Sequence, residues 1–143
     1  MSPTRFWEAA AGRAFVGRLA TGSDLVEEIE RLCAEQGVLA AQVTVIGAVR
    51  RASYAYYEQV DHRYVELGSA THHELVGFVG NVSLRDDRPF LHAHATFADA
   101  SGATVGGHLL RGCEVFAAEV MIRELGDVFL VRAHDEQTGL ALW

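Results

Sequence analysis

Three histidines lie near one another in the chain, in a pattern that suits a metal site. In the segment FLHAHATFA (residues 90–98), apolar residues alternate with polar ones that include His92 and His94, which predicts a strand with one buried face. Alternate residues of a strand share a face, so these two imidazoles lie about 7 Å apart along the chain. The next segment, TVGGHLL (residues 104–110), alternates in the same way and carries His108 on its polar side.

The register between these two strands decides whether the three histidines meet. Residues that lie directly opposite one another in an antiparallel pair have a constant index sum. A sum of 200 sets His92 opposite His108, and a sum of 202 sets His94 opposite His108. Either register brings the three together, with cross-strand Cβ atoms roughly 5 Å apart. A sum of 201 would mix the apolar and polar faces and is rejected. The even sums require an odd-length loop or a bulge over residues 99–103.

Three neutral imidazoles with an open fourth position are typical of a divalent transition metal site, and zinc fits most readily. Gly106 and Gly107 leave room beside this site. The competing interpretation is that the histidines are scattered and bond to the backbone or to water. Their placement on one predicted face of one hairpin favours His92, His94 and His108 as metal ligands.

Glu119 is the candidate for a catalytic acid or base. It lies in VFAAEVMI (residues 115–122), an apolar strand that would bury it partly. A carboxyl in that position could be a fourth ligand, a general base with a raised pKa, or the ion-pair partner of an arginine such as Arg111. The ion pair is the favoured interpretation. His72 and His73 are adjacent and therefore point to opposite faces of a strand, and we expect both to be solvated.

One helix is clearly predicted in the first third of the chain. Its apolar residues recur at the helical period and form a single stripe, which consists of Leu25, Val26, Ile29, Leu32 and Cys33. Ser23 or Asp24 can cap its N-terminus, and Gly37 supplies a left-handed C-cap. We expect this helix to pack on a sheet.

Most of the remaining chain is predicted to form strands. The expected segments are 14–20, 41–46, 51–57, 64–67, 73–84, 90–98, 105–110, 114–125 and 128–132. Short polar turns between consecutive segments indicate antiparallel hairpins. Several strands are apolar on both faces, and a sheet of that kind must be covered on both sides. A single helix is too little cover, so the sequence favours oligomerisation.

The composition bounds the class of protein. The chain has 143 residues, of which 50% are hydrophobic, and this indicates one domain with its own core. We expect a loose N-terminal arm over residues 1–12 and a single domain over residues 13–143. No apolar run reaches the ~20 residues of a membrane helix, and the N-terminus lacks a signal-peptide core. Two cysteines suit a reducing compartment, so the expected location is cytoplasmic.

The charge balance is acidic. Twelve arginines and no lysines stand against 19 acidic residues, for a net charge of −7. General binding to a phosphate backbone needs a basic footprint, and the nearest feature of that kind is the pair Arg50-Arg51. Direct DNA binding is therefore not expected.

Two stretches of the sequence resemble the PPC (plants and prokaryotes conserved) domain. They are LATGSDLVEEIERLCAEQGVLAAQVTVIGAVRRASYAYY and LVGFVGNVSLRDDRPFLHAHATFADASGATVGGHLLRGCEVFAAEVMI. The resemblance covers roughly residues 13–142, and its most specific pieces are GNVSL, the H-x-H strand and GGHLL. It implies an α/β (α+β) fold with a mainly antiparallel sheet, assembled as a homotrimer. His92, His94 and His108 match the family's H-x-H and GGH positions, where the prokaryotic members resemble metal binders.

Three hypotheses about function follow from the resemblance. The leading one is a stand-alone trimeric metal-binding module that holds a small-molecule ligand at a subunit interface. If the protein is an enzyme, the metal would polarise a carbonyl or activate water, with Glu119 as the base. The alternative is a DNA-associated regulatory protein with the trimer as scaffold. The family's DNA-binding label comes from plant members, in which an AT-hook, a short Arg-Gly-Arg motif, precedes the domain, and this sequence has none. The third is a structural trimer whose histidines bind nothing.

Overall fold

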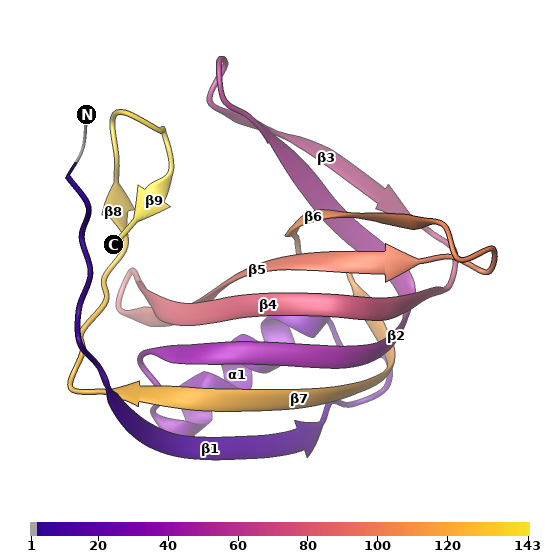
Figure 1. Cartoon of the computed structure of the whole chain (residues 1–143). Helices are drawn as coiled ribbons and strands as arrows, with labels where there is room; N and C mark the ends of the chain where they lie inside the picture. The colour runs from indigo at the N-terminus through magenta and orange to yellow at the C-terminus, as the bar shows by residue number, and fades with distance from the viewer. Residues whose placement is uncertain (1–2) are drawn as a thin grey trace.

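A seven-stranded antiparallel sheet carries a helix on one face (Figure 1). The structure is a computed structural model and describes residues 3–143. Its elements are β1 (Ala10–Arg18), α1 (Leu25–Gln36), β2 (Ala41–Glu58), β3 (Arg63–Ser69), β4 (His73–Arg85), β5 (Arg88–Ala98), β6 (Thr104–Leu109), β7 (Glu114–Gly126), β8 (Ala133–His134) and β9 (Ala141–Leu142). The strand order is β1-β7-β2-β4-β5-β6, with β3 paired to β2 and with β8 and β9 forming a separate hairpin. The predicted fold class is confirmed.

Helix α1 begins and ends at the residues that the sequence indicates. The side chain of Asp24 accepts hydrogen bonds from the backbone N–H groups of Val26 and Glu27, which satisfies donors that the first turn leaves free. Gly37 ends the helix in the left-handed conformation, with φ of 66°. That conformation is costly for residues with a Cβ.

Strand β2 is one long element where two shorter strands were expected. The segments 41–46 and 51–57 are continuous across an irregularity near Gly47. Gly47 has φ of +152°, and a Cβ there would lie 2.1 Å from the carbonyl oxygen of Ala117, so only glycine permits this approach of β2 to β7. The first half of β2 pairs with β4 and β7, and the second half pairs with β3 and β6. Because β6 pairs with both β5 and β2, the pairings of β2, β4, β5 and β6 form a closed ring.

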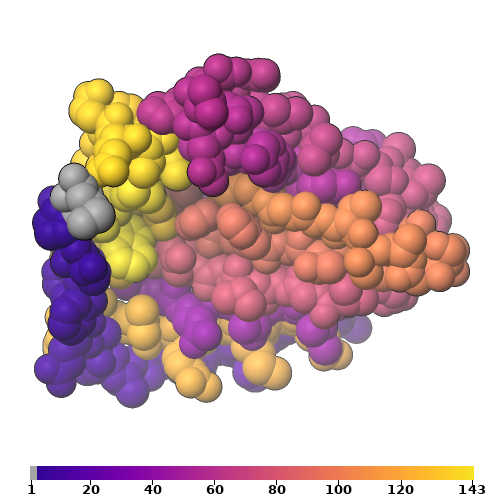
Figure 2. Space-filling view, turned by 45° about the horizontal axis from the view of Figure 1, so that its top comes forward, coloured from indigo at the N-terminus to yellow at the C-terminus, as the bar shows by residue number. Residues whose placement is uncertain are grey.

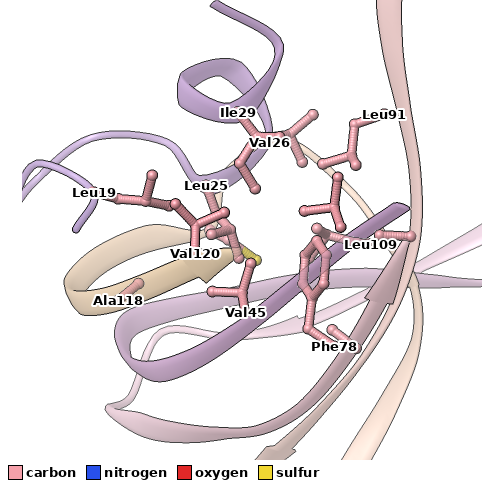
Figure 3. Close-up of a cluster of buried hydrophobic side chains, with 14 of the residues drawn as sticks. Leu19, Leu25, Val26, Ile29, Val45, Phe78, Leu91, Leu109, Ala118 and Val120 are labelled. Carbon is pink, nitrogen blue, oxygen red and sulfur yellow. The ribbon is translucent and has the colours of Figure 1, made fainter. Parts of the chain in front are cut away.

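The hydrophobic core lies between α1 and the sheet. Figure 3 shows Leu25, Val26 and Ile29 of the helix facing side chains of the strands, among them Val45, Phe78, Leu91 and Leu109. All of these side chains are buried. Complete burial of one such side chain contributes about 1.5–3 kcal/mol, so the apolar stripe of α1 fixes the helix on this face.

The opposite face of the sheet has no cover within the described residues and is partly apolar. One row of paired positions runs across it from β1 to β6: Val16, Met121, Thr44, Val79, His94 and His108. Val79 and Met121 are 65% and 61% exposed. This agrees with the expected shortage of cover, and the homotrimer itself stays a prediction.

The two ends of the chain differ from the expectation. Strand β1 begins at Ala10, so the last residues of the expected loose arm pair with β7. The strand expected over residues 14–20 thus begins earlier and ends at Arg18. The small side chains of Ala10 and Ala11 give no strand pattern, and pairing with β7 orders them. Segment 128–132 is not a regular strand. It crosses the end of β4, where Leu84 donates to the carbonyl of Leu130 and accepts from the N–H of Arg132.

The C-terminal segment, residues 133–143 with β8 and β9, lies beside both the N-terminal arm and the β2–β3 hairpin. Figure 2 shows it in yellow between these two parts of the surface. Trp143 packs edge-on against Trp7 of the arm, with ring centroids 5.7 Å apart. The hydroxyl of Tyr57 on β2 donates to the carbonyl of Thr138 at 2.7 Å. In the part of the chain that the structure describes, no helix has the length and apolarity to cross a membrane.

Candidate metal centre

The β5–β6 hairpin brings the three predicted histidines together. His94 lies directly opposite His108, so the register is the one with an index sum of 202. The ring centroids are 5.4 Å apart for His92 and His94, 5.2 Å for His92 and His108, and 5.8 Å for His94 and His108. One ligand atom of each side chain lies within 4.8 Å of the others. The predicted cluster is confirmed as a group that could hold a metal ion.

The loop over residues 99–103 has the odd length that this register requires. The carboxylate of Asp99 accepts hydrogen bonds from the N–H and hydroxyl of Ser101 and from the N–H of Ala103. Gly102 takes φ of +82°, a left-handed conformation that suits glycine. The loop therefore holds β5 and β6 in one register through its own hydrogen bonds.

Gly106 and Gly107 allow close approach of neighbouring backbone. The expectation that they leave room beside the histidines is therefore wrong. A Cβ on Gly106 would lie 2.2 Å from the carbonyl oxygen of Ala95, and one on Gly107 would lie 2.6 Å from that of Ala55. Strand β6 lies against β5 on one side and β2 on the other. The two glycines allow both contacts, and these contacts place His108.

Burial keeps two of the three imidazoles neutral. It lowers the pKa of His92 and of His108 to about 4, and the positive charges of Arg132 and the neighbouring histidines act in the same direction. His94 is exposed, whereas the other two are half-buried. A neutral imidazole is the form that binds a metal ion. Two of the three imidazoles are thus held in the form that could bind a metal ion.

Helix α1 supports the strand that carries the first two histidines. The carboxylate of Glu30 accepts a hydrogen bond from the backbone N–H of Leu91 at 3.0 Å and pairs with Arg111 at 2.5 Å. Arg111 also pairs with Glu27. These contacts tie the residue next to His92 to the helix, so the position of the site depends on the packing of α1.

The residues that surround the cluster have no signature in the sequence. The ring of Tyr64 on β3 stacks on that of His108, with centroids 4.7 Å apart. A cavity of about 200 Å³ lies beside His92 and His108, and its walls include Arg85 and Arg132. No local pattern marks these residues, because β3 and the segment after β7 reach the site only through long-range packing.

Glu119 lies apart from the three histidines. It is on β7, which β2 and β4 separate from β5, and it is exposed. The expected partial burial is wrong, because Glu119 points to the uncovered face of the sheet. The expected ion pair with Arg111 is also wrong, since Arg111 contacts Glu27 and Glu30. Its catalytic role stays a prediction without support from this position.

His72 and His73 behave differently from each other. His72 is exposed, as expected. His73 is buried, its Nδ1 lies 2.8 Å from the carbonyl oxygen of Thr71, and its ring packs edge-on against Phe97. The expectation that both are solvated is therefore wrong for His73, which is part of the core.

Comparisons with known proteins agree with this fold. The model of the Plants and Prokaryotes Conserved (PCC) domain matches residues 7–126. A metal-containing protein from Archaeoglobus fulgidus has a solved structure that is 41% identical, with a TM-score of 0.94 over 98% of this chain and 99% of that one. A plant- and prokaryote-conserved (PPC) protein from Pyrococcus horikoshii is 31% identical, with a TM-score of 0.93 over 98% and 96% of the two chains.

More distant similarities are of two kinds. A "Bifunctional protein GlmU" from Synechococcus sp. (strain JA-2-3B'a(2-13)) is 34% identical over 125 residues, which are 85% of this chain and 18% of that protein. The chain thus spans about a fifth of the length of the curated relatives that it matches. A "putative dna binding protein" from Bacteroides thetaiotaomicron is 19% identical, with a TM-score of 0.84 over 94% and 95% of the two chains, and this likeness concerns the fold alone.

Proposed function

The chain belongs to the Plants and Prokaryotes Conserved (PCC) domain family, and we propose that it is a metal-binding module in which His92, His94 and His108 hold a divalent transition metal, zinc first. The observation that carries this proposal is the convergence of the three ligand atoms within 4.8 Å of one another. The similarity to a protein described as metal-containing supports it.

The donor set fits a transition metal. A zinc ion holds imidazole nitrogens at ~2.0–2.1 Å, so two ligands of one ion are at most about 4.2 Å apart. The side chains would rotate toward one another to bring ligand atoms that lie within 4.8 Å to this separation.

The chain's own residues define what such a site could do. Three imidazoles would leave a metal ion a further coordination position, His94 is exposed to solvent, and the 200 Å³ cavity lies next to His92 and His108. A bound divalent ion would supply Lewis-acid polarisation of a ligand oxygen or a lowered pKa of bound water. Tyr64 holds the ring of His108 by stacking. These residues bind and orient a small-molecule ligand.

We extend the proposal to a homotrimer in which the uncovered face of the sheet is the subunit interface. The exposed apolar side chains Val16, Val79 and Met121 support it, because a patch of this kind on a small protein is typical of an interface. His94 lies at the end of the same row, so a neighbouring copy would approach the open side of the metal site.

The test is the metal content of protein purified without a His-tag or added metal. We expect about one zinc or other transition metal ion per chain, lost in the His92→Ala/His94→Ala variant. The matched control is His72→Ala, which removes an exposed histidine outside the cluster. Circular dichroism establishes that the variants are folded. A wild type that neither contains nor binds a metal on titration would overturn the proposal.

No specific observation among the described residues favours the alternative of a DNA-associated protein. The pair Arg50-Arg51 is the nearest basic feature, and Arg50 already pairs with Glu114 at 3.1 Å. The net charge of −7 opposes binding to a polyanion.

A further inference from the structure

We propose that the cavity beside the three histidines binds a small organic carboxylate, with Arg132 as its main cationic partner. The cavity holds about 200 Å³, below the roughly 300–1,000 Å³ typical of drug-sized ligands. The proposal rests on the proposed function only where it places a metal ion beside the ligand. The two arginines that would bind the carboxylate are present with or without a metal.

Arg132 carries a charge that no carboxylate of the described residues neutralises. Its guanidinium donates to the Oγ of Ser83 at 2.8 Å, to the Oδ1 of Asn81 at 2.8 Å and to the carbonyl oxygen of Ala141 at 2.9 Å. All three acceptors are neutral. By contrast, Arg13 and Arg111 pair with carboxylates. A half-buried charge with only neutral partners is costly, and a bound anion would remove that cost.

The hydrogen bonds also orient Arg132 for recognition. They use three of the five N–H donors of a guanidinium and leave one on each terminal nitrogen. A carboxylate can accept two N–H groups of one guanidinium, and this pairing is stronger than a neutral hydrogen bond. The guanidinium is therefore held in place before a ligand arrives.

A second arginine adds to the positive potential of the cavity. The guanidinium carbons of Arg85 and Arg132 lie 5.2 Å and 5.5 Å from the centroid of the Phe90 ring. Burial and the charge of Arg85 both lower the pKa of Arg132. None of the described residues that line the cavity is acidic, although acidic residues outnumber basic ones in the chain.

The remaining walls indicate an organic anion. Phe90, Leu140 and Leu142 contribute apolar surface, which suits a short hydrocarbon body more than a fully hydrated inorganic ion. His92 and His108 are part of the cavity wall. A carboxylate at Arg132 would therefore have its other end next to the candidate metal ligands.

The experiment measures binding of sodium propionate to the full chain, in metal-free and zinc-loaded forms. Calorimetry and the NMR signal of the Arg132 Nε–H report binding, and sodium chloride keeps the ionic strength constant. Arg132→Gln removes the charge, and Arg31→Gln is the matched control, since Arg31 pairs with Glu28 and Glu35 on α1. We expect saturable binding in the wild type and the control, and binding weaker by roughly tenfold or more in Arg132→Gln.

A second variant keeps the test decisive if Arg132→Gln does not fold. Arg85→Gln changes an exposed residue, and we expect it to weaken propionate binding several-fold. Three results would overturn the proposal: no saturable binding in either form, unchanged affinity in whichever variant folds, or tighter binding of inorganic phosphate with the same dependence on Arg132. Propionate binding to the metal-free form tests the carboxylate site alone, whereas metal content tests the proposed function. Failure of one can therefore be distinguished from failure of the other.

Discussion

His94 and His108 lie directly opposite each other on β5 and β6, and Val79 of β4 is the partner of His94 on its other side. Directly opposite residues project from the same face of a sheet, so this pairing sets both imidazoles on the face away from α1. His92, two residues earlier, joins them there. The candidate metal centre thus depends on one strand register, and it lies at the edge of an uncovered apolar face.

Gly106→Ala tests whether the register depends on close approach of β6 to β5. The new Cβ would lie 2.2 Å from the carbonyl oxygen of Ala95, so we expect a loss of about 1–3 kcal/mol in the free energy of unfolding and a lower metal content. Gly77→Ala is the control, because its Cβ would meet only Thr96 at 3.8 Å. Denaturant unfolding and metal analysis measure both. Equal stability of the two variants would contradict the prediction.

The metal-free protein should lose stability as the pH falls from 6.5 to 4. Burial lowers the pKa of His92 and His108 in the folded state to about 4, whereas unfolded histidine titrates near ~6.5. The unfolded state therefore binds more protons in this window, and acid favours unfolding. Thermal melts in the presence of a chelator should show a steeper fall of Tm for the wild type than for His92→Asn/His108→Asn. Parallel curves would refute the assignment.

Met121→Asp should dissociate the assembly that we propose. Met121 lies between Val16 and Thr44 in the row on the uncovered face, where a buried charge in an interface would be costly. Val60→Asp is the control, since Val60 is exposed in the turn after β2. Analytical ultracentrifugation should give a trimer for the wild type and for Val60→Asp, and a smaller species for Met121→Asp. A monomeric wild type would eliminate the trimer.

Glu119→Gln should leave the metal content unchanged. Two strands separate β7 from β5, so Glu119 does not reach the histidines of its own chain. Metal analysis of the purified variant, beside the wild type, measures this. A loss of metal would instead assign Glu119 to the site of a neighbouring copy.

Asp24→Ala should weaken the attachment of α1. Asp24 caps the helix through Val26 and Glu27 and also accepts a hydrogen bond from the N–H of Gly112. Loss of an N-cap costs about 0.5–2 kcal/mol, which lowers Tm by several degrees in a domain of this size. Asp24→Asn retains an efficient capping group and should be closer to the wild type in a thermal melt. Identical melting of Asp24→Ala and wild type would contradict the role of the cap.

Local patterns in the sequence determined much of the candidate site. The alternation in residues 90–98 and 104–110 limited the register to two choices, and both bring His92, His94 and His108 together. The helix was equally clear, because the cap at Asp24, the apolar stripe and Gly37 all act over a few residues. Side-chain periodicity is a local property of the backbone, and for this reason it can be read from the chain alone.

Only the tertiary structure decided what surrounds the histidines. Tyr64 and Arg132 come from segments far from the β5–β6 hairpin and reach it by packing, and no short-range pattern records such contacts. The same holds for Glu119, where an apolar segment suggested burial but the uncovered face of the sheet leaves the side chain exposed. Alternation assigns a residue to a face, whereas cover of that face depends on which distant elements, or other chains, pack against it.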